Sequence, residues 1–311
     1  MNTKAGYVAI LGLPNVGKST LLNALLGQKI SIINEEPQTT RKRILGILSE
    51  ENYQIIFLDT PGILKASYLL QEKMMDDVNR SIRDADIFLL MIDANDDPDG
   101  KKLFSLPEVD KIMNSGIPAI LVLNKVDLIK QEVVTTLISR FEGKGRFKSV
   151  IPLAANVNFN IQKVLVEIVD LLPEHPKYFP ENIVAEENER FFVSEIVREK
   201  VLELYREEIP YSVEVLINDF KEREDSKDYI EAEIVVEKES QKGIIIDRQG
   251  SAIKKLGEIS PVPLQVGHFS FVSMFISGLT LCLVICIKPN LLSGNTLCFS
   301  FWAPSRLRIF S

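Results

Sequence analysis

Four residues near the N-terminus have the types and the spacing of a phosphate-binding loop. Gly12, Gly17, Lys18 and Ser19 fit the pattern G-x-x-x-x-G-K-[ST], between an apolar stretch at 7–11 and a helical apolar pattern. Such glycines let backbone N–H groups surround a phosphate at a helix N-terminus. Lys18 would reach the β- and γ-phosphates and the Ser19 hydroxyl would bind Mg²⁺. The loop predicts a nucleoside triphosphate site.

A second polar cluster, "NKVD", indicates which base is bound. An apolar strand at 119–123 would deliver Asn124, Lys125 and Asp127 at its carboxyl end, where open α/β sheets bind ligands. The Asp127 carboxylate can accept hydrogen bonds from N1–H and the exocyclic amine of guanine. Adenine would leave it unpaired, and sites that depend on such bonds reject the wrong ligand by roughly 10⁴–10⁵. The two clusters together predict a guanine nucleotide.

Two segments between these clusters have the character of switch elements. The apolar stretch at 53–58 leads into "DTPG", where Asp59 would hold the Mg²⁺ shell through water and the Gly62 N–H would contact the γ-phosphate. A second switch is expected before it, where "PQTTRKRILG" contains two adjacent threonines. We favour Thr40 as the residue that contacts magnesium, with Thr39 as the alternative.

The composition indicates a cytosolic protein with an unusual end. A length of 311 residues suggests two domains. The net charge of −7 divides into −10 for residues 1–260 and +3 for residues 261–311, and the latter contain all three cysteines. A thiol-free body fits a reducing compartment, and the N-terminus shows no signal-peptide pattern. The acidic body argues against nucleic-acid binding by bulk charge, so that any RNA site must be local.

The elements that position these residues form two units. Residues 1–172 carry the strand and helix patterns of the nucleotide site, and three prolines mark 173–188 as a linker. Residues 189–260 show a helix at 3.6-residue spacing, two alternating strands, and then "ESQKGIIIDRQGSAIKKLG".

The motifs "GLPNVGKST", "PQTTRKRILG", "DTPG" and "NKVD", followed by an RNA-type module, make residues 5–259 resemble the Era family of bacterial GTPases. The resemblance implies a doubly wound α/β P-loop GTPase domain followed by a smaller α+β KH domain of type II. It further implies that GTP or GDP binding regulates contact with small-subunit (16S) ribosomal RNA near its 3′ end, in maturation of the 30S subunit. A cytoplasmic monomer is expected.

The resemblance also implies roles for individual residues. The expected nucleotide-binding residues are Gly12, Asn15, Val16, Gly17, Lys18, Ser19, Thr20, Asp59, Gly62, Asn124, Lys125, Asp127, Ala154 and Ala155. The expected catalytic residues are Lys18, Thr40, Gly62 and Asn15, and the expected Mg²⁺ ligands are Ser19, Thr40 and Asp59. Ala154 stands where the family usually has serine, but the backbone N–H that contacts guanine O6 is retained.

The residue after the "DTPG" glycine bears on the hydrolysis step. Many small GTPases have a glutamine there that positions water, whereas this chain has Ile63. Neither His175, in the linker, nor His268, in the tail, offers a general base. Asn15 matches an asparagine that such GTPases use to ligate a potassium ion beside the phosphates. The alternative is that Asn15 only hydrogen-bonds the loop.

The expected RNA-binding loop departs from the family at one position. In the G-x-x-G loop of KH domains, the backbone packs against the nucleotides. Gly250 occupies the second glycine position, but Asp247 occupies the first, where its side chain would crowd and repel a phosphate chain. The expected RNA-binding residues are Arg248, Gln249, Gly250, Lys254 and Lys255. The sequence predicts RNA binding that Asp247 weakens; the alternative is a helix-turn-helix without an RNA role.

The chain departs from the family altogether after about Ser260. The KH domain is expected to be truncated, without its third strand and with an unpaired sheet edge. Residues 269–287 contain no charged side chain and are about as long as a membrane span. Three interpretations of residues 261–311 stay open: a membrane anchor, a segment that packs on the truncated domain, and an out-of-frame end.

The function follows in outline, with two alternatives. The first interpretation is a slow GTPase that couples its nucleotide state to rRNA binding. The second is a nucleotide switch without RNA binding, held at the inner face of the cell membrane by the tail. The third is a truncated chain in which only residues 1–172 function.

Overall fold

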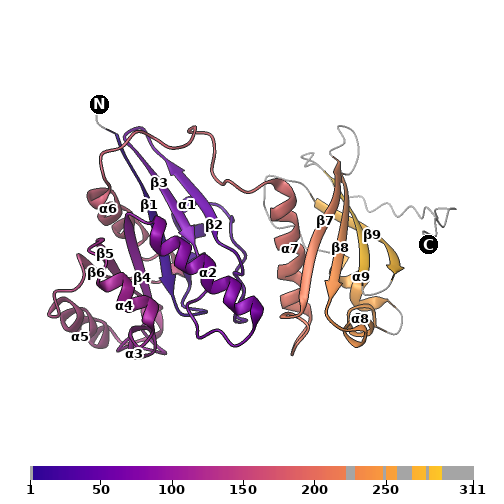
Figure 1. Cartoon of the computed structure of the whole chain (residues 1–311), viewed down its shortest axis with the longest axis horizontal. Coiled ribbons are helices and arrows are strands. Elements are labelled where there is room, and N and C mark those ends of the chain that lie inside the picture. Colours follow the sequence, from indigo (N-terminus) through magenta and orange to yellow (C-terminus); the bar gives the residue numbers. More distant parts are fainter. Residues whose placement is uncertain (1–2, 222–227, 248–249, 258–267, 278–279, 289–311) are drawn as a thin grey trace.

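The computed structural model describes residues 3–221, 228–247, 250–257, 268–277 and 280–288. Figure 1 shows two units, each built on one β-sheet and connected by the segment that runs from α6 to α7. The first unit contains the motifs of the nucleotide site, and the second contains the expected RNA-binding loop.

The first unit is organised by a six-stranded sheet in the order β2-β3-β1-β4-β5-β6, in which only β2 is antiparallel to its neighbour. The strands are β1 (Lys4–Gly12), β2 (Ile44–Ser49), β3 (Tyr53–Asp59), β4 (Ile87–Asp93), β5 (Ala119–Asn124) and β6 (Ser149–Pro152). Every residue of β4 and β5 is buried, as expected for parallel strands covered on both faces. Because parallel strands end at one edge, Gly12, Asp59 and Asn124 come together there.

Helices cover both faces of this sheet. They are α1 (Lys18–Leu26), α2 (Leu69–Asp84), α3 (Lys101–Phe104), α4 (Pro107–Met113), α5 (Gln131–Glu142) and α6 (Ile161–Leu171), with 3₁₀ turns η1 (Val126–Leu128) and η2 (Ala155–Val157). One buried cluster packs α1 and α6 on one face, and a second packs α2 to α5 on the other. This arrangement confirms the predicted doubly wound α/β fold.

The proline-rich linker at 173–188 is bound along the first unit. The Gln54 side chain donates to the Phe179 carbonyl at 2.8 Å and accepts from the backbone amides of Tyr178 and Phe179. Further along, the Ile47 amide of β2 donates to the Val184 carbonyl at 2.6 Å. These bonds fix the path of the chain between the units.

The second unit packs three helices against an antiparallel sheet in the order β7-β8-β10-β9. Its elements are α7 (Glu189–Leu204), β7 (Val213–Lys221), β8 (Asp228–Val236), α8 (Glu239–Ile246), α9 (Ser251–Gly257), β9 (His268–Ser277) and β10 (Thr280–Lys288). Its core joins apolar side chains of α7, β7 and β8 with Ile245, Ile253 and Leu256 from the two short helices. The order helix, strand, strand, helix, helix agrees with the predicted KH arrangement.

The edge of β8 differs from the prediction. We expected an unpaired edge, but β10 pairs with β8 from Thr280 opposite Val235 to Ile287 opposite Asp228. The apolar segment at 269–287 is rich in phenylalanine, valine and isoleucine, which favour strands, and it forms most of β9 and β10. No helix within the described ranges is long and apolar enough to cross a bilayer. Of the three interpretations of the tail, this pairing agrees with a segment that packs on the second unit.

Candidate nucleotide-binding site

The loop between β1 and α1 requires its glycines. Gly17 has φ of 95°, and a Cβ there would lie 2.3 Å from Nδ2 of Asn124. A Cβ on Gly12 would lie 2.6 Å from the Met91 carbonyl oxygen. Larger residues would therefore have to displace β4 or the Asn124 side chain, and the loop could not keep its shape.

Lys18 is the first residue of α1, and its side chain extends across this loop. Its Nζ donates to the Leu13 carbonyl at 2.9 Å and to the Gly12 carbonyl at 3.4 Å. Burial lowers the pKa of Lys18 to about 8, and nearby Asp59 opposes the shift. An anionic phosphate at the mouth of the loop would restore the preference for the ammonium form.

Ser19, Thr40 and Asp59 converge at the start of α1. The Ser19 hydroxyl donates to Oδ2 of Asp59 at 2.8 Å and lies 2.9 Å from Oγ1 of Thr40. Thr39 points elsewhere, because its hydroxyl donates to the Glu36 carbonyl at 2.6 Å. The geometry thus favours Thr40 over Thr39 as the threonine of this cluster.

The oxygen cluster suits a hard divalent cation. Asp59 is fully buried, and burial raises the pKa of its carboxyl group. Its Oδ1 has no hydrogen-bond partner among the described residues. Magnesium prefers such oxygen ligands and retains several waters, so that the hydroxyls of Ser19 and Thr40 and the free oxygen of Asp59 fit it.

Ser31 is a member of this cluster that the sequence motifs did not reveal. Its hydroxyl donates to the same Oδ2 of Asp59 at 2.8 Å, and Asn23 of α1 fixes the Ser31 backbone through two hydrogen bonds. No motif marks a serine at this distance from the loop. Only the folded path of the chain after α1 could bring it to Asp59.

The residues expected to bind the base gather where β5 ends. Nδ2 of Asn124 donates to the Val16 carbonyl at 2.7 Å, and its Oδ1 accepts from the Ala155 amide at 3.1 Å. Asn124 therefore connects the phosphate loop with the buried Ala154–Ala155 segment. Lys125, with φ of 63°, forms an ion pair with Asp93 at 2.7 Å. Asp127 is exposed in η1, immediately beyond.

A cleft of about 1270 Å³ opens over these residues. Its walls include predicted residues from the phosphate loop, both switches and the base motif, namely Asn15, Gly17, Lys18, Ser19, Thr20, Thr40, Gly62, Asn124 and Lys125. Gly12, Val16, Asp59, Asp127, Ala154 and Ala155 lie outside this lining. One wall is contributed by the second unit, through Leu202, Glu203, Tyr205 and Arg206.

The residues expected to govern hydrolysis lie close to the loop. A Cβ on Gly62 would meet the backbone of Pro14 at 2.5 Å, and the next residue, Ile63, is completely buried. Nδ2 of Asn15 donates to the Glu35 carbonyl at 2.5 Å. Asn15 thus contacts the segment that precedes Thr39 and Thr40, not its own loop. His175 stacks on Tyr178 in the linker, away from the cleft lining.

The first position of the expected RNA-binding loop is filled by an unusual backbone. Asp247 has φ of 61° and ψ of −175°, a region that glycine normally occupies. Its carboxylate accepts hydrogen bonds from the Ser251 and Ala252 amides at 2.9 and 3.0 Å. Gly250 has φ of 69°, and Lys255 is exposed on α9. Arg248, Gln249 and the Lys254 side chain lie outside the described residues.

Comparison with known proteins agrees with both halves of this arrangement. A family described as 50S ribosome-binding GTPase matches residues 7–125, and a family described as KH domain matches residues 208–261. GTPase Era of Geotalea daltonii is 45% identical over 253 residues, which cover 81% of this chain and 84% of that protein. The chain belongs to the Era family of GTPases. The chloroplastic relatives are similar too, with GTPase ERA1 of Zea mays 43% identical over 85% of this chain.

Two solved Era structures are similar to most of this chain. Era in complex with MgGDPNP and nucleotides 1506–1542 of 16S ribosomal RNA has a TM-score of 0.77 and 39% identity, covering 83% of this chain and 87% of that one. Aquifex aeolicus Era bound to GDP·AlF₄⁻ has a TM-score of 0.75 and 38% identity, covering 82% and 87%. The chain spans 64% and 62% of the length of the maize and rice chloroplastic relatives.

Proposed function

We propose that this Era-family protein binds GTP with Mg²⁺, hydrolyses it slowly, and couples its nucleotide state to binding of small-subunit ribosomal RNA. The observation that carries the proposal is the convergence of Ser19, Thr40 and Asp59 beside Lys18, at the carboxyl edge of the sheet. The 16S fragment and MgGDPNP in the Era complex of similar fold support the same assignment.

The residues divide the binding task. Backbone amides of the loop and of α1 would surround the phosphates, and Lys18 would add a positive charge there. Ser19 and Thr40 would hold Mg²⁺ directly and Asp59 through water. Bound Mg²⁺ supplies charge stabilisation for the transferring phosphoryl group. Asp127 would accept from the guanine edge and fix the choice of base.

Hydrolysis is expected to be slow without a further factor. Ile63 replaces the glutamine that orients water in many small GTPases, and its side chain is buried in the core below the cleft. An isoleucine can neither donate to nor accept from water. GTPases that lack their activating groups turn over very slowly.

The activity can be tested by phosphate release from GTP and from ATP with the full-length chain and Mg²⁺. The proposal predicts release from GTP alone, at a rate that is linear in protein concentration. Equal release from both nucleotides, or no release from GTP above the protein-free blank, would contradict it.

We propose potassium as a second cation of this site, held in part by Asn15. In the structure the Asn15 amide group donates to the Glu35 carbonyl, which leaves its carbonyl oxygen for a cation. A monovalent cation beside the phosphates would supply charge that an arginine finger gives elsewhere, a role worth about 10³–10⁵ in rate. Hydrolysis should be faster in KCl than in NaCl of equal concentration. Equal rates in the two salts would exclude the potassium site.

The RNA-binding surface is proposed to include Gly250, Lys254 and Lys255, with Arg248 and Gln249. Asp247 would weaken it, because its carboxylate carries a negative charge that repels the phosphate chain. The amides of Ser251 and Ala252 partly offset that charge.

The monomeric state, the cytoplasmic location and peripheral contact with the cell membrane stay predictions, which sedimentation and cell fractionation would check.

A further inference from the structure

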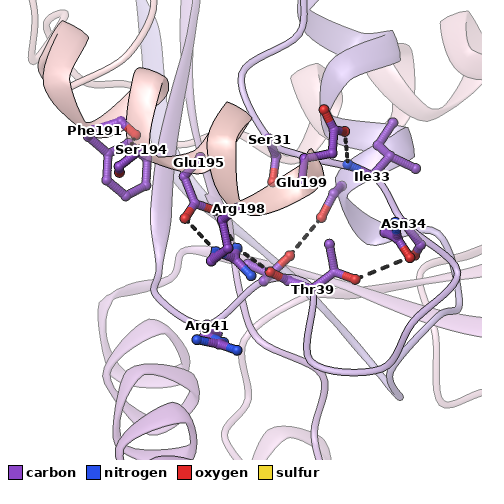
Figure 2. A network of polar contacts seen from close by, with 12 residues as sticks. Ser31, Ile33, Asn34, Thr39, Arg41, Phe191, Ser194, Glu195, Arg198 and Glu199 are labelled. Atoms are coloured by element: carbon purple, nitrogen blue, oxygen red, sulfur yellow. Dashed lines mark hydrogen bonds and ion pairs between the residues drawn. The ribbon is translucent and has the colours of Figure 1, made fainter. Parts of the chain in front are cut away.

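The segment that precedes β2 is held by the second unit. We call residues 29–41, which end one residue after Thr40, the switch loop. At its start, Nζ of Lys29 forms an ion pair with Oε2 of Glu199 at 2.6 Å, and the Ile33 amide donates to Oε1 of the same carboxylate at 3.2 Å. Figure 2 shows Glu199 reaching from α7 to Ile33.

The other end of the switch loop is held in the same way. Nη2 of Arg198 donates to the Thr39 carbonyl at 2.5 Å, directly before Thr40 (Figure 2). Glu195 fixes the guanidinium from behind, with its Oε1 2.8 Å from Nε of Arg198. Because the acceptor is a backbone carbonyl, Arg198 acts on the path of the chain.

The turn after α7 and the first residue of β7 add contacts to the switch loop. Nη1 and Nη2 of Arg41 donate to the carbonyls of Val213 and Pro210, each at 2.6 Å. The Tyr211 hydroxyl donates to Oε2 of Glu36 at 2.8 Å. The second unit therefore contacts the switch loop near both ends and in the middle.

These contacts are buried but incompletely satisfied. Arg198 and Glu199 are only 4% and 3% exposed. Nη1 of Arg198 and Nε of Arg41 have no hydrogen-bond partner in the described part of the chain. Burial, and then the neighbouring Arg198, lowers the pKa of Arg41 to about 10. Separation of the two units would let both guanidinium groups hydrate, so that the contact is suited to open as well as to close.

We propose that Arg198 and Glu199 are positioning residues for GTP hydrolysis: they hold Thr40 beside Ser19, so that the second unit completes the magnesium side of the nucleotide site. The inference rests on the proposed GTPase function of this cleft. Thr40 lies one residue from the carbonyl that Arg198 binds, and its Oγ1 lies 2.9 Å from Oγ of Ser19.

A selective loss is expected when this contact is removed. Thr40 serves Mg²⁺ and the γ-phosphate, whereas GDP is held by the phosphate loop and the base motif. Loss of one hydrogen bond from a charged donor should lower kcat for GTP about tenfold or more. The affinity for GDP should change by less than about twofold, since Lys18 and Asp127 are untouched.

The test compares full-length Arg198→Met with Arg190→Met. Arg190 is exposed on the same helix and donates to Asn218 within the second unit, at 3.3 Å. The proposal predicts that only Arg198→Met lowers kcat and raises the Mg²⁺ concentration for half-maximal hydrolysis, with unchanged GDP affinity. Unchanged or faster hydrolysis in Arg198→Met, or an equal loss in both variants, would overturn it.

A second pair of variants separates positioning from folding. Glu199→Gln keeps an oxygen that can accept from the Ile33 amide, whereas Glu199→Met removes it. The proposal predicts that the glutamine variant retains most of kcat and that the methionine variant behaves as Arg198→Met. Equal losses in the two Glu199 variants would count against it. If the unmodified chain does not hydrolyse GTP, the proposed function fails first, and this inference fails with it.

Discussion

Lys18 and Asp59 can carry opposite charges and are buried at the same edge of the sheet. Burial lowers the pKa of Lys18 and raises the pKa of Asp59, so that it favours the neutral form of each. A phosphate beside Lys18 and a cation beside Asp59 would reverse both tendencies. The site is therefore built for ligands that carry the missing charges. Local motifs could predict both residues, because the phosphate loop marks Lys18 and "DTPG" after an apolar strand marks Asp59. It could not predict Ser31, which reaches Asp59 only through the fold.

Lys18→Ala should remove nucleotide binding or turnover. The ammonium group lies inside the loop. Among the described residues, the other lysine that lines the cleft is Lys125, which lies at the end expected to hold the base. We expect the GTP affinity to fall at least ~10²-fold, the loss of a charge-assisted contact in a buried site. Fluorescent-nucleotide titration measures this. The exposed Lys148→Ala serves as the control, and undiminished hydrolysis by Lys18→Ala would refute the assignment of the site.

Asp127→Asn should change the preferred base. An asparagine keeps one oxygen that can accept from N1–H but replaces the other with an amide donor, which repels the 2-amino group of guanine and can donate to the 2-oxo group of xanthine. We expect GTP affinity to fall at least ~10²-fold and XTP to bind instead. Competition titrations with GTP and XTP would show it. Asp110→Asn, at an exposed position of α4, should leave the preference unchanged; retained GTP preference in the Asp127 variant would contradict the base assignment.

At the scale of elements, the join between α8 and α9 combines strain with capping. Asp247 occupies a backbone region that costs roughly 1–3 kcal/mol for a residue other than glycine. Its carboxylate caps two amides of α9, a contact worth about 0.5–2 kcal/mol. The aspartate thus replaces a conformational advantage of glycine with a hydrogen-bonding one. The sequence predicted the crowding at this position, but not the cap.

Replacing Asp247 separates the two effects. Asp247→Ala loses the cap and keeps the strain, whereas Asp247→Gly loses both. We expect the glycine variant to be about 1–3 kcal/mol more stable than the alanine variant in urea denaturation followed in the second unit. Equal stability of the two variants would mean that the backbone is not strained. Asp247→Gly should also bind single-stranded RNA more tightly than the unmodified chain.

The strands β9 and β10 could not be predicted from the sequence pattern. The uncharged segment at 269–287 fits both a membrane span and a pair of strands, because periodicity cannot separate buried strands from a continuous apolar run. The two differ in their partner: in the structure β10 pairs with the edge of β8, a strand distant in sequence. The helix-and-strand order up to α9 was predictable, since α7, β7 and β8 each show their own spacing.

At the scale of the molecule, the RNA-binding unit depends on the strands that the tail contributes to its sheet. A chain that ends at residue 260 would leave the β8 edge unpaired, and exposed edges promote association between chains. We expect this truncation to aggregate and to lose stability in the second unit. A chain that ends at residue 290 keeps β9 and β10 and is the matched control. If the shorter chain is as soluble and as stable as the control, the strand pairing contributes nothing.

The central claim is that nucleotide state and RNA binding are coupled, and one measurement tests it directly. The full-length chain and Asp247→Gly are titrated with a single-stranded oligonucleotide that copies the 3′ end of small-subunit ribosomal RNA, each loaded with a non-hydrolysable GTP analogue or with GDP. Coupling free energies between sites commonly correspond to about 5–150-fold in affinity. The account predicts tighter binding in the GTP-analogue state, by at least ~5-fold. Equal affinity in both nucleotide states, or no binding by either chain, would contradict it.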